Sequence, residues 1–139
     1  MYPVVSPCCK FMFYLSGWGK THNFYLDGVC LRREGEGWVK IHRIEKKVMG
    51  YYPMTYAFEE EGQPCVVCLS IENTAYQLFK FNIADGTCSR ISVGYEGYNF
   101  IIDQVLPSGI ITGVAACANY KTFFYYEKGK LTLVPPQHK

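Results

Sequence analysis

The chain has 139 residues, of which 49% are hydrophobic, 17% aromatic and 19% charged, and its formal net charge is +2. This length suffices for one domain with a real core, and the hydrophobic share excludes intrinsic disorder. The small net charge argues against a duplex nucleic acid partner, because proteins that bind one carry a strong basic excess. The best apolar run, 109–118, is far shorter than the roughly 18–20 residues of a membrane-spanning helix, so no membrane partner is expected.

The N-terminal stretch "MYPVVSPCCKFMFYLSGWG" is apolar, but it lacks a basic region and contains Pro3 and Pro7. It is therefore a poor signal peptide. The seven cysteines are odd in number, and four of them (Cys30, Cys65, Cys68 and Cys117) lie in apolar stretches. This pattern predicts reduced, buried thiols and a cytoplasmic protein, with a disulfide framework as the alternative.

The first third of the chain predicts one buried strand and one hairpin. The strand covers 10–16 and leads into a loop at 16–25. The hairpin covers 29–44, because apolar and polar residues alternate on both sides of the glycine turn at 34–37. A short helix over 41–50 is a weaker reading of the same segment, so this part of the chain is predicted to be strand.

The middle of the chain predicts the same order of elements. Strands are expected at 51–58 and 65–71, followed by the hairpin "FKFNIADGTCSRISV" at 79–93. The dipeptide Asp85-Gly86 is the strongest short signal for a tight hairpin turn.

The last third repeats this order once more. Strands are expected at 99–106 and 110–118, followed by a hairpin at 122–134 whose turn lies at 127–130. Helix signals are nearly absent from the whole chain, so the sequence predicts an all-β fold.

The turn glycines give the spacing of this repeat. Gly37 and Gly86 are 49 residues apart, and Gly86 and Gly129 are 43 residues apart. A four-stranded unit recurring every roughly 40–50 residues resembles the β-propeller repeat, although the Trp-Asp dipeptide of some propeller families is missing. The resemblance implies a single all-β domain over 1–139 made of three blade-like antiparallel repeats, at roughly 1–45, 50–94 and 98–134.

Three blades do not complete a propeller, because propellers close with about four to eight. The open edges of an incomplete ring invite pairing with other chains. We therefore expect self-association, either as a homodimer that completes a six-bladed ring or as another symmetric oligomer. The alternative is a compact β-sandwich or barrel.

No catalytic or metal motif stands out. Cys65 and Cys68 have the Cys-x-x-Cys form, but positions i and i+3 of a strand point to opposite faces, which favours core thiols over a redox or zinc pair. Cys88 has no histidine near it in sequence, and Asp103 is expected at an outward-facing strand position. No glycine-rich phosphate loop is present, so neither a cofactor nor a metal is expected.

Cations and aromatic residues are mixed within 16–43. Arg side chains bind phosphate with two hydrogen bonds, and aromatic rings stack on bases or on Arg. Lys40 and His42 are expected to share one face of their strand while Arg43 faces the other way. The candidate ligand-binding residues are Trp18, Lys20, His22, Tyr25, Arg32, Arg33, Lys40, His42 and Arg43, and the alternative is an ordinary solvated surface.

These features favour a non-catalytic binding protein that sequesters a small anionic or nucleotide-like ligand in a loop or an inter-subunit pocket. One alternative is a protein-interaction module that uses exposed aromatic residues and free strand edges. Another is a hydrolase or lyase acting on a phosphate-containing substrate, with His22 or His42 as the general base.

Overall fold

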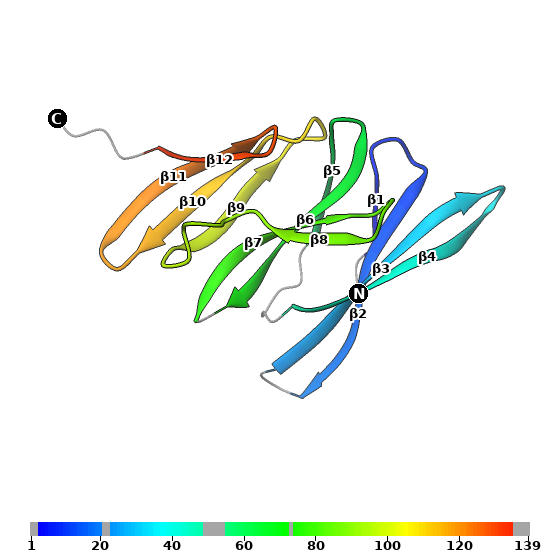
Figure 1. The fold of residues 1–139 in the computed structure, drawn as a ribbon, viewed down its shortest axis with the longest axis horizontal. Coiled ribbons are helices and arrows are strands. Elements are labelled where there is room, and N and C mark those ends of the chain that lie inside the picture. Colours follow the sequence, from blue (N-terminus) through cyan, green and yellow to red (C-terminus); the bar gives the residue numbers. More distant parts are fainter. Residues whose placement is uncertain (1–2, 21–22, 49–54, 73, 135–139) are drawn as a thin grey trace.

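The chain forms twelve β-strands and no helix in the parts that the structure describes. The structure is a computed structural model that describes residues 3–20, 23–48, 55–72 and 74–134, and for 18–20, 23–26 and 46–48 it describes the backbone alone. The strands make three four-stranded antiparallel sheets, and in each sheet the strands lie in sequence order. Figure 1 shows these sheets side by side in chain order. The all-β prediction with three four-stranded repeats is confirmed.

The N-terminal sheet contains β1 (Val4–Val5), β2 (Phe11–Lys20), β3 (Asn23–Glu34) and β4 (Gly37–Val48). The predicted loop at 16–25 is wrong, because β2 and β3 continue to pair as far as Lys20 and Asn23. The alternative of a helix at 41–50 is also wrong: β4 runs through this segment, and Val48 still pairs with Leu26. Pairing with β3 supplies the backbone hydrogen bonds that a short helix would otherwise have to make internally.

The middle sheet contains β5 (Thr55–Glu60), β6 (Gln63–Glu72), β7 (Ala75–Asn82) and β8 (Thr87–Arg90). The C-terminal sheet contains β9 (Asn99–Val105), β10 (Ile111–Cys117), β11 (Tyr120–Glu127) and β12 (Lys130–Val134). Most of these strands lie where the alternating segments of the sequence predict them. Of the strand expected at 51–58, residues 51–54 lie outside the described residues, and the hairpin expected to reach 93 ends earlier, at Arg90.

Several turns have the backbone conformation that tight hairpins need. Glu61 and Gly62 have φ values of 51° and 77°, and Lys128 and Gly129 have 50° and 79°. Two successive positive φ values match the right-handed twist of the strands that the turn joins. Asp85 acts differently: its carboxylate accepts hydrogen bonds from the Thr87 amide and hydroxyl, at 3.0 and 2.7 Å. The Asp85 carboxylate therefore stabilises the turn between β7 and β8, as the Asp85-Gly86 dipeptide predicted.

The middle sheet is covered on both faces, and this arrangement defines the core. In β6, Val66 and Cys68 face the N-terminal sheet, whereas Cys65 and Val67 face the C-terminal sheet. The prediction that Cys65 and Cys68 point to opposite faces is confirmed. Strands β5, β6 and β7 therefore have apolar side chains on both sides, as expected for strands buried on both faces.

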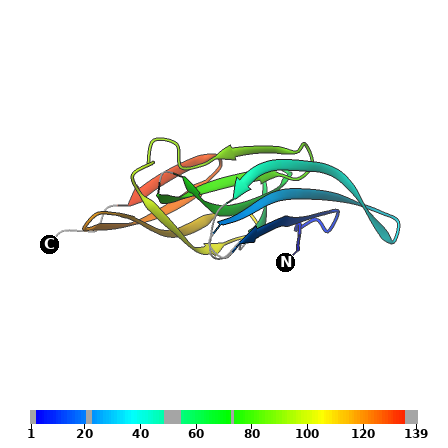
Figure 2. The ribbon, with the colours of Figure 1, turned by 90° about the horizontal axis from the view of Figure 1, so that it is seen from below.

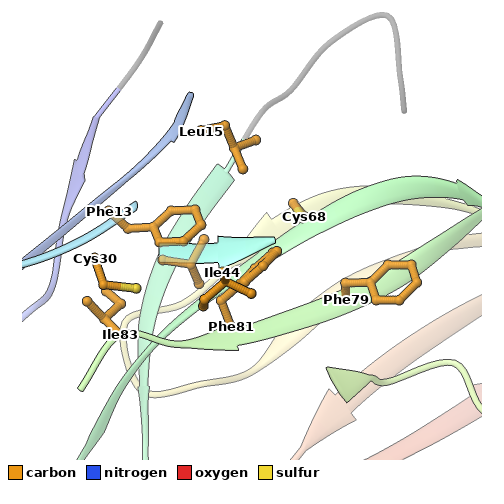
Figure 3. Close-up of a cluster of buried hydrophobic side chains, with 9 residues drawn as sticks. Phe13, Leu15, Cys30, Ile44, Cys68, Phe79, Phe81 and Ile83 are labelled. Atoms are coloured by element: carbon orange, nitrogen blue, oxygen red, sulfur yellow. The ribbon is translucent and has the colours of Figure 1, made fainter. Parts of the chain in front are cut away.

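The first interface lies between the N-terminal and middle sheets. Phe13 and Phe81 are fully buried there, with ring centroids 5.0 Å apart. Figure 3 shows Phe13 and Cys30 on one side and Phe81 and Ile83 on the other. This cluster joins residues far apart in the sequence.

The second interface lies between the middle and C-terminal sheets. Phe100 and Phe124 form an edge-to-face pair with centroids 5.3 Å apart. They pack with Val67 and Leu78 of the middle sheet. The same kind of contact, one sheet face against the next, therefore occurs twice in the chain.

The sheets are arranged like successive propeller blades. The first strands of the three sheets adjoin, since β1 contacts β5 and β5 contacts β9. The described part of the chain is elongated in the two perpendicular views and does not close into a ring (Figures 1 and 2). Within it, no helix is long and apolar enough to cross a membrane.

Candidate functional site

For four of the nine predicted ligand-binding residues, the structure describes no side chain. His22 lies outside the described residues altogether, and so do the side chains of Trp18, Lys20 and Tyr25. The backbone of Trp18 pairs with that of Tyr25 across β2 and β3. Their role in binding stays a prediction.

Two more, Arg32 and Arg33, lie near the tip of the β3–β4 hairpin. Both are exposed, and the Arg32 guanidinium is 3.4 Å from the Glu34 carboxylate. The Arg33 backbone amide donates a hydrogen bond to the Lys10 carbonyl at 2.8 Å. The ion pair between Arg32 and Glu34 is exposed, and exposed ion pairs contribute little to stability.

The remaining three candidates are Lys40, His42 and Arg43 in β4, and a β-bulge in this strand changes which of them share a face. Lys40 pairs with Leu31, whereas His42 pairs with Cys30, so the two side chains belong to successive rows. Arg43 pairs with Val29, which shares a face with Leu31. The prediction that Lys40 and His42 share a face is therefore wrong: the bulge puts one extra residue between them and places Lys40 on the face of Arg43.

His42 points toward the middle sheet. Its Nε2 atom is 2.9 Å from the Ala84 carbonyl oxygen, which only accepts hydrogen bonds, so this nitrogen donates. The ring also lies against Gly86, where an added Cβ would come 2.7 Å from it. His42 thus helps to fix the β7–β8 turn against the N-terminal sheet.

Arg43 lies on the opposite, outer face of the N-terminal sheet. Its guanidinium donates to the Asp27 carboxylate at 3.1 and 3.3 Å. The structure therefore does not bring Arg43 and His42 together on one surface.

A cationic group that the sequence argument missed, Arg90, lies at the end of β8. Its Nη1 donates to Glu72 at 2.9 Å and its Nη2 to Glu96 at 2.8 Å. Its Nε is buried and has no hydrogen-bond partner among the described residues. Hollows of about 360 and 280 Å³ border Arg90, and Phe79 lines the larger one while Lys80 and Tyr126 line the smaller one.

Lys80 and Tyr126 belong to a polar network between the middle and C-terminal sheets. Lys80 Nζ is 2.5 Å from Glu60 Oε2, and the Tyr126 hydroxyl donates to the other oxygen of Glu60. Burial lowers the pKa of Lys80, but the hydrogen bond and charge of Glu60 outweigh it and raise the pKa overall. Burial, followed by the bond to Glu60, raises the pKa of Tyr126 from 10.0 to about 12. At neutral pH the network is an ammonium–carboxylate–phenol set, which suits structural linkage better than base catalysis.

Among the described residues, neither a reactive thiolate nor a metal-binding cluster is supported by the geometry. Burial raises the pKa of Cys30 to about 12 and that of Cys65 to about 11, which disfavours their nucleophilic thiolates. None of the seven cysteines, all of which lie in the described part of the chain, forms a disulfide bond. In the described part of the chain, no group of three His, Cys, Asp or Glu side chains is arranged to hold a metal ion.

The most distinctive surface is the outer face of the C-terminal sheet, which points away from the middle sheet. Ile101 pairs with Val114, Val114 with Phe123, and Phe123 with Val134, so four apolar residues form one row across all four strands. We call these four residues the apolar row. Phe123 is 64% exposed and Ile101 60% exposed. A hollow of about 500 Å³ lies along the row and is bordered by Asp103 and Tyr125.

The sequence contained a signal for this surface. In β11, Phe123 and Tyr125 are exposed while Phe124 and Tyr126 are buried. A strand with aromatic residues on both faces is typical of a sheet covered on both sides, as β6 is. Reading the four aromatic residues as a two-sided strand would have pointed to the outer face.

Comparisons with protein-family models, with curated proteins and with solved structures find no match to this chain. Its candidate site is therefore defined by geometry.

Proposed function

We propose that this protein is a non-catalytic interaction module that binds another protein through the outer face of its C-terminal sheet. The observation that carries this proposal is the apolar row, which spans four strands and includes two side chains that are at least 60% exposed. Contiguous exposed apolar surface of this kind marks interaction sites in soluble proteins.

The chemistry of the face also fits a protein partner. Phe123 and Tyr125 supply the aromatic surface that is enriched at the centre of protein interfaces. Asp103 and Lys121 lie on or beside the same face as polar groups at its margins. An apolar centre with polar margins is the usual layout of a specific interface.

Site-specific photo-crosslinking tests this proposal. A benzophenone amino acid replaces Phe123, and a second variant carries it at Val93, which is 65% exposed but lies outside the C-terminal sheet. We expect protein crosslinks in cells from position 123 and few from position 93. An absence of protein crosslinks from position 123 in folded protein would overturn the proposal.

A small anionic ligand beside Arg90 is the second candidate function. The buried Nε of Arg90 offers a hydrogen bond to a ligand acceptor in one of the adjoining hollows. The charges weigh against it, because Arg90 is already paired with two carboxylates and Lys80 with one. Mass spectrometry of the small molecules released on denaturation tests it: an intact anion that is absent from the Arg90→Leu variant would support this function, and an empty protein would contradict it.

A further inference from the structure

We infer that the partner of the C-terminal sheet is a second copy of this chain, bound head to tail through the outer face of its N-terminal sheet. This inference rests on the proposed function and names the partner of the same surface. It predicts a closed dimer in which six sheets form one ring.

The first support is that both ends of the stack have apolar outer faces. On the N-terminal sheet, Met12 pairs with Leu31 and Tyr14 with Val29, so apolar side chains form two adjacent rows on the face opposite Phe13. The apolar row occupies the other end of the stack. Each end sheet therefore carries apolar side chains on both faces. On the outer face of the N-terminal sheet, Met12, Tyr14 and Leu31 are partly exposed, and Val29 between them is buried.

The second support is continuity with the two existing interfaces. The chain already packs one sheet face against the next, first through Phe13 and Phe81 and then through Leu78 and Phe124. In Figure 1, β2, β6 and β10 point toward the same side of the molecule, so successive sheets repeat one orientation. A fourth sheet stacked in that orientation on the C-terminal sheet would be the N-terminal sheet of another copy.

The size of the contact is adequate for a stable dimer. Strands about 4.8 Å apart that rise about 3.4 Å per residue give a four-stranded face of roughly 450 Å² over seven residues. A two-chain ring buries four such faces, roughly 1,800 Å² in all, which lies within the standard range for specific interfaces. A heterologous contact of this kind forms a ring when its rotation closes and a filament when it does not.

Light scattering coupled to gel filtration tests the inference first by mass. We expect the wild type to have twice the chain mass of 15.9 kDa. Phe123→Asp on one outer face and Leu31→Asp on the other should each yield monomers. The control Val93→Asp, at a position that is as exposed as Phe123 and lies outside both faces, should remain dimeric. Circular dichroism melting curves check that each variant is folded.

Three results would overturn the inference. A dimer that is lost with Phe123→Asp but kept with Leu31→Asp would mean that two C-terminal sheets bind each other. Masses that increase with concentration beyond the dimer would mean that the contact is open. A folded wild-type monomer at every concentration would exclude a second copy, and crosslinks from position 123 to other proteins would then leave the proposed function standing.

Discussion

At the scale of single residues, Gly113 is the position where the backbone leaves least room. It lies at a register shift between β10 and β9, and a Cβ added there would be 2.0 Å from the Ile101 carbonyl oxygen and 2.7 Å from the Phe124 ring. The carbonyl belongs to a paired strand and cannot move aside easily. Side chains are therefore excluded from this point in the sheet.

We expect Gly113→Ala to lower the free energy of unfolding by about 2–3 kcal/mol, as overpacked cores do. Urea denaturation measures the change. Gly97→Ala is the control, since a Cβ at that position meets no atom within 4 Å. Equal effects of the two substitutions would contradict the close approach at Gly113.

A second residue-scale prediction concerns Tyr126 and alkaline pH. Its pKa is raised from 10.0 to about 12 in the folded state, so its contribution to stability is complete below pH 10 and is lost as the pH rises toward 12. Tyr126→Phe should therefore show a smaller fall in the free energy of unfolding over this interval than the wild type. Identical pH profiles from chemical denaturation would show that the phenol does not titrate in this way.

At the scale of elements, β7 shows how one strand serves two cores. Phe79 and Phe81 face the N-terminal sheet, and Leu78 faces the C-terminal sheet. The alternation needed for this arrangement is local and visible in the sequence. The sequence does not show which sheet lies on each side, because that depends on residues distant in the chain, such as Phe13 and Phe81, which are in contact although 68 positions apart.

We expect Phe81→Ala to destabilise the protein by about 3–5 kcal/mol, because it leaves a cavity beside Phe13. Tyr120→Ala removes an aromatic residue that is 40% exposed at the start of β11 and should cost less than about 1 kcal/mol. Thermal unfolding followed by circular dichroism compares the two variants. Similar costs would mean that the interface around Phe81 is not a packed core.

The β4 strand shows where reasoning from local pattern fails. Simple alternation predicts that Lys40 and His42 share a face, but the bulge puts them on different faces. His42 then bonds to Ala84, which lies 42 residues away. The alternation of residues 37–48 gives no sign of this bulge, which becomes visible only in the pairing of β4 with β3.

At the scale of the whole molecule, the middle sheet couples the two ends of the stack. Both tryptophans, Trp18 and Trp38, belong to strands of the N-terminal sheet, whereas Phe124 lies in the interface at the other side of the middle sheet. The two apolar clusters share the backbone of β6 and β7. Loss of one cluster should therefore weaken the other.

We expect Phe124→Ala to shift the urea midpoint measured by tryptophan fluorescence as far as the midpoint measured by circular dichroism. This result follows if all three sheets unfold as one unit. A fluorescence midpoint that stays at the wild-type value while the circular dichroism midpoint falls would show that the N-terminal sheet unfolds separately.

The sequence by itself determined the strands, most of the turns and the threefold repeat, because these depend on alternation and on glycine or aspartate at turns, which act over a few residues. It also determined that Cys65 and Cys68 diverge, because the strand period is two. Only the tertiary structure decided which faces are covered, which cations are already paired, and that the aromatic residues of β11 leave one apolar row exposed. These features depend on contacts between residues that are distant in the chain, and a local pattern does not specify which distant residue will be the neighbour.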